Sequence, residues 1–396
     1  MDFTLDRAAQ DAQAEARDLA AVVAPLAVEA DGMSTLHMGV LDALRDSRLC
    51  ELTVPAQWGG RHAEVDPVAV CVAREVLMAT SSHLDSLFAL QGIGSYAISR
   101  AGTDEQQAHW LPRVATAEVL AGLALTEPEA GSDLRGMETT VTAEGDSLVV
   151  DGPKSWISNG GVAGFYTVLG REALGDGGEG MSLILVPADA AGVSTGPTPE
   201  IIAPHVLGEV TLDGVRLGAD ARIGQPGEGL SHVLATLAVF RVSVAGAAVG
   251  LAQRALEEAT RHAATREQFG RPLARLGAVA SLLADSWADV EQARLITYRA
   301  AHLAREDPAA ALPHSSMAKL AASEAAGRVV DRCVQVMGRW GLVKDSQIER
   351  LYRQARPMRI YEGASEVLRL GIAKGLVDEV MSGRGSVGEA SGGGPA

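Results

Sequence analysis

The chain has 396 residues, a formal net charge of −16 at pH 7, and 47% hydrophobic but only 4% aromatic side chains. This length exceeds what one hydrophobic core usually organises, so we expect two or three domains. The acidic surplus argues against nucleic acid and anionic membranes as general partners, because no broad basic surface is available to meet them.

The cysteines and the N-terminus bear on the cellular compartment. Cys50, Cys71 and Cys333 are odd in number and form no CxxC pair, which predicts buried thiols in a reducing compartment. The N-terminus has an early acid and no uninterrupted apolar core, so we expect no signal peptide and a cytoplasmic protein. The most apolar window, Val233–Ala252, has Arg241 near its middle, where insertion would cost about 2.5–3.5 kcal/mol. We expect a buried helix there, not a membrane span.

The first 118 residues are helical in character and form the predicted N-terminal domain, 1–118. A loop with Pro and paired Gly, Pro55–Gly60, interrupts the helices. The expected helices are Leu5–Ala24, Thr35–Leu49, Pro67–Thr80, Ser82–Arg100 and one that begins with the capping sequence at Thr103.

Residues 119–225 change to short apolar runs separated by turn residues, which predicts a central β domain. Glu144–Asp146 is typical of a hairpin turn, and Gly175–Gly180 of an exposed hairpin loop. The GxSxG string Gly192–Gly196 is interpreted as a turn, because the prolines that follow exclude a nucleophile elbow. The expected strands are Val119–Leu125, Thr139–Ala143, Ser147–Val150, Tyr166–Leu169, Ser182–Val186 and Val210–Leu217.

Helical periodicity returns in residues 226–381, the predicted C-terminal domain. Ser365 is the expected N-cap of its last helix. The tail, 382–396, is rich in Gly and Ser without apolar periodicity, which predicts disorder. The expected helices are Leu230–Arg261, Leu276–Arg305, Pro313–Met337, Ile348–Arg356 and Ser365–Met381.

Common catalytic signatures are absent from the sequence. There is no GxxxxGK[ST], HExxH or paired CxxC, and the nine histidines do not cluster at metal spacing. GxGxxG matches at Gly175–Gly180 and Gly383–Gly388, but neither match lies between a strand and a helix. P-loop, metal-hydrolase and Rossmann chemistry are therefore disfavoured.

Four dense local strings remain: Leu125–Asp133, Gly152–Gly160, Ala264–Leu273, and Gln335–Gly338 taken together with Ile360–Gly363. In these strings and their order the chain resembles the acyl-CoA dehydrogenase family over nearly its whole length. The resemblance implies an α+β multi-domain fold, with an N-terminal helical domain, a central β-barrel or sandwich domain and a C-terminal four-helix bundle.

The resemblance implies FAD as cofactor. Thr126 and Ser158, expected on loops of the β domain, would offer hydrogen bonds to the flavin, and Trp156 would cover one face of it. Arg266 would pair with the pyrophosphate beside Phe269, and in the family these come from a neighbouring subunit, which implies a homo-oligomer, such as a dimer of dimers. The residues assigned to FAD in this way are Leu125, Thr126, Ser132, Trp156, Ser158, Arg266, Gln268, Phe269, Gln335, Gly338, Ala364 and Glu366.

The same resemblance assigns four residues to the acyl thioester. Ser132 would lie near its pantetheine arm and Arg241 near the CoA end, with Tyr361 and Gly363 beside the reacting carbons. A buried arginine needs a partner in any case, so an internal ion pair remains an alternative for Arg241.

Glu362 is the expected catalytic base. Alone, a carboxylate between an aromatic residue and a glycine ahead of a helix is usually an ordinary helix-entry acid. The resemblance instead implies that it removes the α proton of the thioester while the β hydrogen leaves as hydride to flavin N5, giving the enoyl thioester. Some family members place the base at the position of Phe240, which cannot accept a proton.

Departures from the family pattern and the electron acceptor leave alternatives open. Arg339, Ala364, Gly277 and Ala238 replace usual family residues around the dinucleotide and the CoA end. A carrier-protein thioester therefore stands beside acyl-CoA as a substrate class. Reoxidation by an electron-transfer flavoprotein is expected, while a flavin oxidase or hydroxylase, or a non-catalytic partner subunit, remains an alternative.

Overall fold

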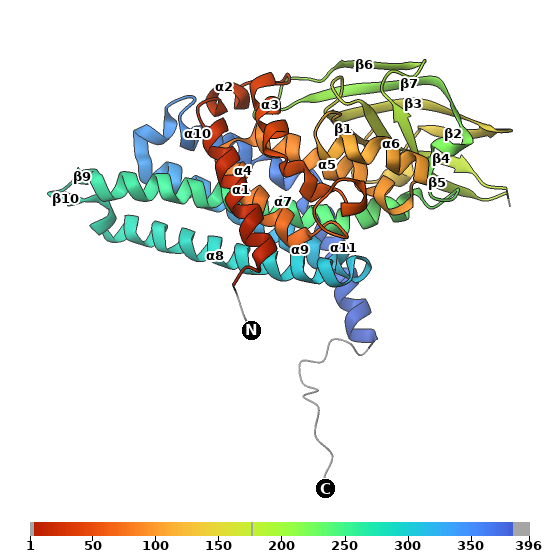
Figure 1. Cartoon of the computed structure of the whole chain (residues 1–396). Coiled ribbons are helices and arrows are strands. Elements are labelled where there is room, and N and C mark those ends of the chain that lie inside the picture. Colours follow the sequence, from red (N-terminus) through yellow and green to blue (C-terminus); the bar gives the residue numbers. More distant parts are fainter. Residues whose placement is uncertain (1–3, 176, 383–396) are drawn as a thin grey trace, which may run out of the picture.

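The long helix α7, Gly229–Thr265, runs through the middle of the computed structural model, which describes residues 4–175 and 177–382 (Figure 1). On one side it contacts α4, Pro67–Thr80, and on the other α8, Gly277–Glu306, and α9, Pro308–Met337. A Cβ at Gly250 would lie 1.9 Å from the carbonyl oxygen of Glu75 on α4. Glycine there is thus what allows the two backbones to approach so closely.

The N-terminal helices largely follow the predicted boundaries. The sequence at Thr103 forms a capping box with Gln106 at the start of α6, as predicted. One helix begins three residues later than expected, because Nδ1 of His37 accepts the backbone N–H of Val40 and caps it there. The helices besides α4 are α1 Arg7–Val23, α2 Ala27–Asp31, α3 Met38–Ser47, α5 Ser82–Ala101 and α6 Asp104–Ala115.

The central region forms one sheet of eight strands in the order β6-β7-β3-β2-β4-β5-β8, with β1 paired in parallel to β4. All six predicted strands are present, and Glu144–Ser147 closes the β2–β3 hairpin as predicted. The interpretation of Gly192–Gly196 as a turn was wrong: Val193–Pro197 pairs with β7. The strands are β1 Ala121–Ala124, β2 Thr140–Glu144, β3 Ser147–Ser158, β4 Phe165–Ala173, β5 Glu179–Pro187, β6 Val193–Pro197, β7 Leu207–Gly218 and β8 Arg222–Ile223.

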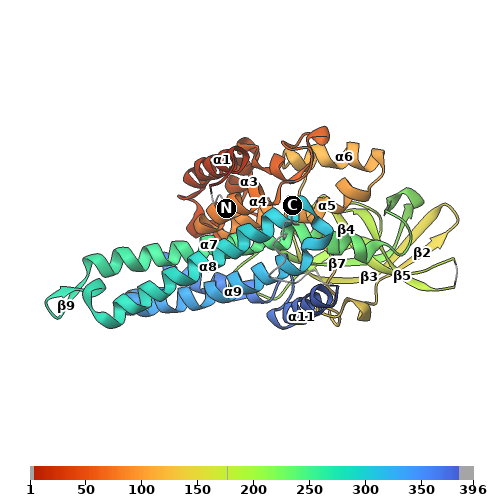
Figure 2. The same cartoon turned by 90° about the horizontal axis from the view of Figure 1, so that it is seen from below.

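The C-terminal helices form a long bundle that extends away from the sheet (Figure 2). Helix α9 begins five residues before the predicted Pro313, because Asp307 caps it with two backbone N–H bonds and Pro308 occupies its first turn. Ser365 is the first residue of α11, Ser365–Met381, and not its cap; its hydroxyl donates to Glu324 instead. The predicted disorder of 383–396 lies outside the described residues.

Buried positions agree with the compositional expectations. Cys50, Cys71 and Cys333 are buried, and burial raises the pKa of each thiol. By length and composition α7 could cross a membrane, but its apolar window lies mostly inside the protein. It therefore serves as the core helix of the bundle.

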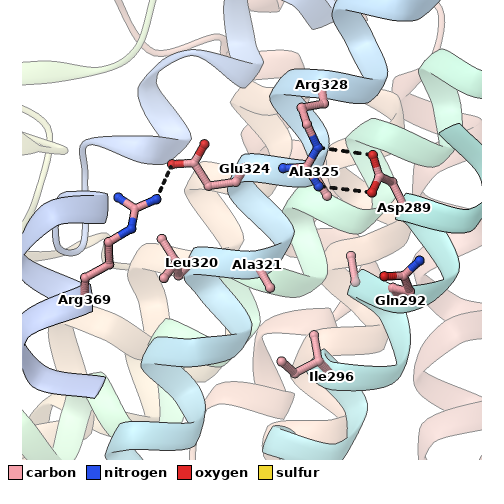
Figure 3. Close-up of a pocket in the computed structure, with 10 residues that line it drawn as sticks. Asp289, Gln292, Ile296, Leu320, Ala321, Glu324, Ala325, Arg328 and Arg369 are labelled. Carbon is pink, nitrogen blue, oxygen red and sulfur yellow. Dashed lines mark hydrogen bonds and ion pairs between the residues drawn. The ribbon is translucent and has the colours of Figure 1, made fainter. Parts of the chain in front are cut away.

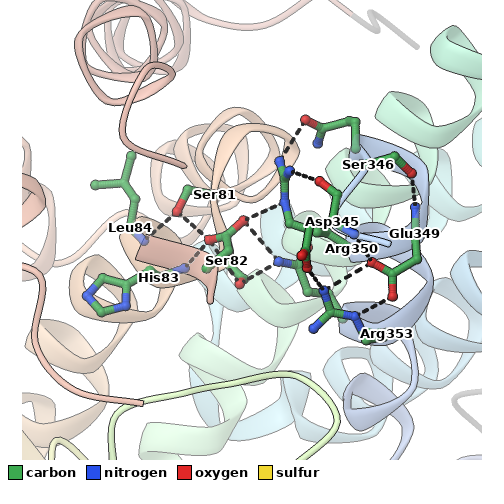
Figure 4. A network of polar contacts seen from close by, with 12 residues as sticks. Ser81, Ser82, His83, Leu84, Asp345, Ser346, Glu349, Arg350 and Arg353 are labelled. Atoms are coloured by element: carbon green, nitrogen blue, oxygen red, sulfur yellow. Dashed lines mark hydrogen bonds and ion pairs between the residues drawn. The ribbon is translucent and has the colours of Figure 1, made fainter. Parts of the chain in front are cut away.

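A buried polar network ties the N-terminal helices to α10, Gln347–Ala355 (Figure 4). The Asp31 carboxylate accepts the Ser81 hydroxyl at 2.6 Å and the Gln354 amide at 3.0 Å, and Nε of Arg350 lies 3.7 Å from it. Because all four side chains are buried, these contacts fix the position of the segment that leads to residues 357–364.

Candidate functional site

The loop Ile360–Ala364 holds Glu362 in a conformation that non-glycine residues rarely adopt. Its φ is 52°, and the next residue, Gly363, has a φ of 102°. Two cations hold the carbonyl groups of this turn: Nε of Arg241 donates to the Glu362 oxygen at 2.9 Å, and Nζ of Lys319 donates to the Gly363 oxygen at 2.8 Å. Helices α7 and α9 together therefore fix the strained turn.

The Glu362 side chain is half-buried and its carboxyl group is incompletely paired. Its Oε2 is inaccessible to solvent and makes no hydrogen bond within the described chain. Burial raises the pKa of Glu362 above its usual range, opposed by the charges of Arg74, Arg241 and Lys319. A carboxylate with a raised pKa and a free oxygen shielded from solvent is suited to accept a proton.

A second buried pair supplies part of the positive field at Glu362. Nε and Nη2 of Arg74 donate to the two Asp85 oxygens at 2.9 and 2.7 Å, and Nη1 donates to Ser243 at 2.9 Å. The sequence analysis missed Arg74, Asp85 and Lys319. Their signal was a charged residue inside an otherwise apolar helical face, as in Ala73-Arg74 and Ala318-Lys319.

The rival base position is part of the core. The Phe240 ring is fully buried and meets Tyr96 edge to face, at 5.5 Å between centroids. A Cβ at Gly92 would lie 2.1 Å from the Phe240 ring, so α5 is shaped around the phenylalanine. The ring carries no group that can accept a proton, which leaves Glu362 as the candidate base.

The residues that the sequence analysis assigned to the substrate lie at different distances from the Glu362 loop. Arg241 is the closest, because it bonds to the Glu362 carbonyl and, at 2.9 Å, to the Ser316 hydroxyl. The recorded partners of Arg241 are thus a carbonyl and a hydroxyl oxygen, so these bonds do not form the internal ion pair that the sequence left open, and they do not bear on a CoA phosphate. Tyr361 is 40% exposed beside Glu362, while Ser132 lies on an exposed loop after β1.

A buried ion pair fixes the position of the candidate flavin-binding residues Leu125 and Thr126 in the β domain. Nζ of Lys154 lies 2.7 Å from Oε1 of Glu127 and donates to the Leu125 carbonyl at 3.2 Å. The N–H of Ser155 donates to the Thr126 carbonyl at 2.9 Å. Burial acts to raise the pKa of Glu127, but Lys154 and neighbouring donors outweigh it and hold that pKa low. The pair thus fastens the segment after β1 to β3.

Trp156 and Ser158 belong to strand β3, which corrects the expected place of Ser158 on a loop. A register shift between Lys154 and Ile157 and a φ of 58° turn Trp156 out, so that it is 45% exposed. The Ser158 hydroxyl lies 3.0 Å from Nε2 of His205, a contact that the sequence analysis did not anticipate. Burial lowers the pKa of His205 to about 4, so its ring is neutral at pH 7.

Five other candidate cofactor residues lie at the far end of the bundle. Arg266, Gln268 and Phe269 occupy the hairpin of β9, Glu267–Gln268, and β10, Arg271–Pro272, at the opposite end of the molecule from the sheet (Figures 1 and 2). Gln335 and Gly338 lie at the C-terminal end of α9. Their neighbour Met337 packs against the same hydrophobic core cluster as Leu273, which follows the hairpin in the chain. A single chain therefore does not bring these residues together with the candidate flavin residues of the β domain.

The β-domain residues and those at the far end of the bundle are both suited to bind a ligand with a flat ring and a phosphate-bearing end. Trp156 exposes an aromatic surface at one end, and Phe269, 88% exposed, does so at the other beside the exposed Arg266. Ala364 is half-buried and Glu366 exposed near Glu362. In the described ranges, no group of three or more His, Cys, Asp and Glu side chains could hold a metal ion. The residues fit a flavin dinucleotide.

A surface hollow between α8, α9 and α11 offers no comparable chemistry (Figure 3). Its charged side chains are already paired: Arg328 with Asp289 at 3.1 Å, and Arg369 with Glu324 at 3.7 Å. The hollow does not include Glu362.

Family models match almost the whole described chain. They are those of the acyl-CoA dehydrogenase N-terminal domain over residues 7–118, middle domain over 122–215 and C-terminal domain over 227–377. The chain belongs to the acyl-CoA dehydrogenase family. It is accordingly an oxidoreductase that acts on CH–CH groups, and its three-part fold is that of the family.

Individual relatives agree with this assignment. The chain is 32% identical to the cyclohexane-1-carbonyl-CoA dehydrogenase of Geobacter metallireducens over 359 residues, which are 90% of this chain and 94% of the relative. It resembles the butyryl-CoA dehydrogenase structure from Megasphaera elsdenii with a TM-score of 0.90 and 27% identity, over 95% of this chain and all of the other. An acyl-CoA dehydrogenase from Bacillus anthracis in complex with FAD gives a TM-score of 0.86 and 27% identity, over 96% of this chain and 68% of that one.

Proposed function

We propose that this protein uses FAD to convert an acyl-CoA thioester into the α,β-enoyl thioester, with Glu362 as the base that removes the α proton. The observation that carries the proposal is the Glu362 carboxyl group, which has a raised pKa and an Oε2 that is shielded from solvent and has no hydrogen-bond partner in the described part of the chain. Membership of a family of CH–CH oxidoreductases supplies the reaction class.

The chain's own residues would prepare proton removal in three ways. Arg241 and Lys319 hold the backbone turn from which the Glu362 side chain extends. Their charges and that of Arg74 oppose the rise in the pKa of Glu362 that burial causes. Burial keeps bulk water away from Oε2, which leaves that oxygen free for a substrate proton. When bound, FAD accepts the β hydrogen as a hydride.

The residues that would hold FAD come from two copies of the chain. Leu125, Thr126, Trp156 and Ser158 would hold the flavin ring at the β domain of one copy. The far end of a second copy would contribute to the dinucleotide, because Arg266, Phe269 and their neighbours lie too far along the bundle to reach the same ligand within one chain (Figure 2). Those neighbours are Gln268, Gln335 and Gly338. This arrangement supports a homo-oligomer, and the family resemblance implies a dimer of dimers.

Partners and location belong to the same proposal. Electrons would leave through an electron-transfer flavoprotein, as the family resemblance implies. The cytoplasm is the proposed location, which the three buried and unpaired cysteines support. Acyl chain length and the choice between CoA and a carrier protein are decided by an acyl-thioester panel scored by flavin reduction.

The base assignment is tested with Glu362→Gln. Gln keeps the size of the side chain but accepts no proton, so we expect the anaerobic bleaching of the flavin by acyl-CoA to slow by about 10²–10⁴-fold or more while FAD remains bound. The raised pKa places the acid limb of the wild-type rate profile above the usual titration of a glutamic acid, since the protonated form is inactive and the rate falls as pH drops. A variant that bleaches as fast as wild type would refute the assignment.

Anaerobic mixing also tests the reaction class. Bleaching without oxygen, together with an enoyl product, supports dehydrogenation. Product formation that requires oxygen would point to an oxidase or hydroxylase, and no bleaching with any thioester would point to a non-catalytic subunit.

A further inference from the structure

Lys319 is a fully buried cation whose ammonium group lies against the base loop. It lies on α9 between Ala318 and Leu320, and its recorded hydrogen bond goes to the Gly363 carbonyl oxygen at 2.8 Å, an uncharged acceptor. Burying an ammonium group is costly, and an alanine-rich helix has no need of it for packing. A buried lysine at this position is therefore expected to act on the loop to which it is bonded.

The bond defines one end of a strained turn. Arg241 fixes the Glu362 carbonyl at 2.9 Å, and Lys319 fixes the next carbonyl along the chain. Together they orient two successive peptide planes around Glu362, whose φ of 52° is unfavourable for a residue with a side chain. Without Lys319, only the first of the two planes would be held by a buried cation.

We propose that Lys319 is a positioning residue for the catalytic base: by holding the Gly363 carbonyl it keeps Glu362 in the left-handed conformation that leaves Oε2 free. This inference rests on the proposed function, in which Glu362 is the base. Lys319 acts through the loop and touches neither the reacting carbons nor a cofactor atom in this assignment.

The charges around the pair support a second effect of Lys319. Arg74, Arg241, Lys319 and Asp85 face Glu362, while Glu362, Arg241, Glu324 and Glu366 face Lys319. Burial lowers the pKa of Lys319 to about 8, so the group is still mainly charged at neutral pH. Its charge opposes the effect of burial on Glu362. Loss of that charge must therefore move the acid limb of the rate profile to higher pH.

The decisive variant is Lys319→Met, which keeps the length of the side chain but removes both donor and charge. In the FAD-loaded protein we expect anaerobic flavin bleaching to slow by about 10²-fold, the size of effect that a misplaced catalytic group produces. We also expect the acid limb to move upward and the amides of residues 360–364 to exchange faster with deuterium. Lys319→Arg keeps a charged donor and should recover most of the rate. Lys374→Met on α11, which removes an exposed Nζ that pairs with Asp378 at 2.8 Å, is the control.

The outcomes separate this inference from the proposed function. A Lys319→Met protein with the wild-type rate and acid limb overturns the positioning role. If that variant does not retain FAD, Lys319→Gln, which shortens the side chain and removes the charge, replaces it, and a wild-type rate together with an unchanged acid limb then overturns the role. Glu362→Gln is measured in parallel: full activity there refutes the proposed base itself, whereas an inactive Glu362→Gln beside a normal Lys319→Met refutes only the present inference.

Discussion

The buried pair of Lys154 and Glu127 offers a test of how the β domain is held for its ligand. Lys154→Met would remove the ammonium that lies 2.7 Å from Glu127 and donates to the Leu125 carbonyl. Both side chains of the pair are almost completely buried, with 0% and 2% of their surface exposed. The variant would therefore leave an uncompensated carboxylate in the interior.

The expected loss of stability is large. Breaking a buried ion pair by removing one partner typically costs about 3–5 kcal/mol, and a value near the lower end is expected because Glu127 keeps the Thr139 N–H as a donor. Lys154→Met/Glu127→Gln should recover part of the loss, since the unpaired charge is then gone. Lys374→Met removes an exposed cation and should leave stability unchanged.

The pH dependence has a definite sign. In the wild type the pKa of Glu127 is lowered, so its contribution to stability is present above the unfolded value of 4.5 and is lost as pH falls through the folded pKa. Without Lys154, burial would raise that pKa, and protonation would relieve the unpaired charge. The stability gap between variant and wild type should therefore narrow as pH falls from neutrality to about pH 5.

The assay is urea unfolding followed by the fluorescence of tryptophan, with bound FAD measured by absorbance before unfolding. We expect Lys154→Met to lose FAD as well as stability, because Leu125 and Thr126 are fastened to β3 through this pair. A variant within about 0.5 kcal/mol of wild type at neutral pH, with full FAD content, would refute the reasoning.

Two further predictions concern the cofactor site and the core. Trp156→Ala and Arg266→Ala should each weaken FAD binding. When the two variants are dissociated and mixed, about half of the sites in hybrid dimers should combine the unchanged Trp156 of one copy with the unchanged Arg266 of the other, and absorbance titration with FAD should show that binding recovers. No recovery would contradict a site shared between copies. Gly92→Ala places a Cβ 2.1 Å from the Phe240 ring and should cost about 1–3 kcal/mol in urea unfolding. Gly371→Ala, with no described atom within 4 Å of its Cβ, should not lower stability, and equal effects of the two changes would show that packing against the ring is not the cause.

Most secondary structure could be predicted from local pattern. The capping sequence at Thr103 and the apolar runs of the sheet are local signals, and each formed the expected element. The misassigned strand at residues 193–197 came where a segment distant in the sequence decides the outcome. Val193–Pro197 is a strand because β7 supplies its hydrogen bonds, and no residue within it signals that pairing.

The sequence by itself determined the family, the succession of helices, sheet and bundle, and Glu362 as the candidate base, because short strings carry these signals. Only the tertiary structure showed that Arg241 and Lys319, on different helices, hold the two carbonyls of the Glu362 turn. It likewise placed the two sets of candidate flavin residues at opposite ends of the molecule (Figure 1). Contacts between distant segments and the length of a helical bundle are products of packing, which no local pattern of residues records.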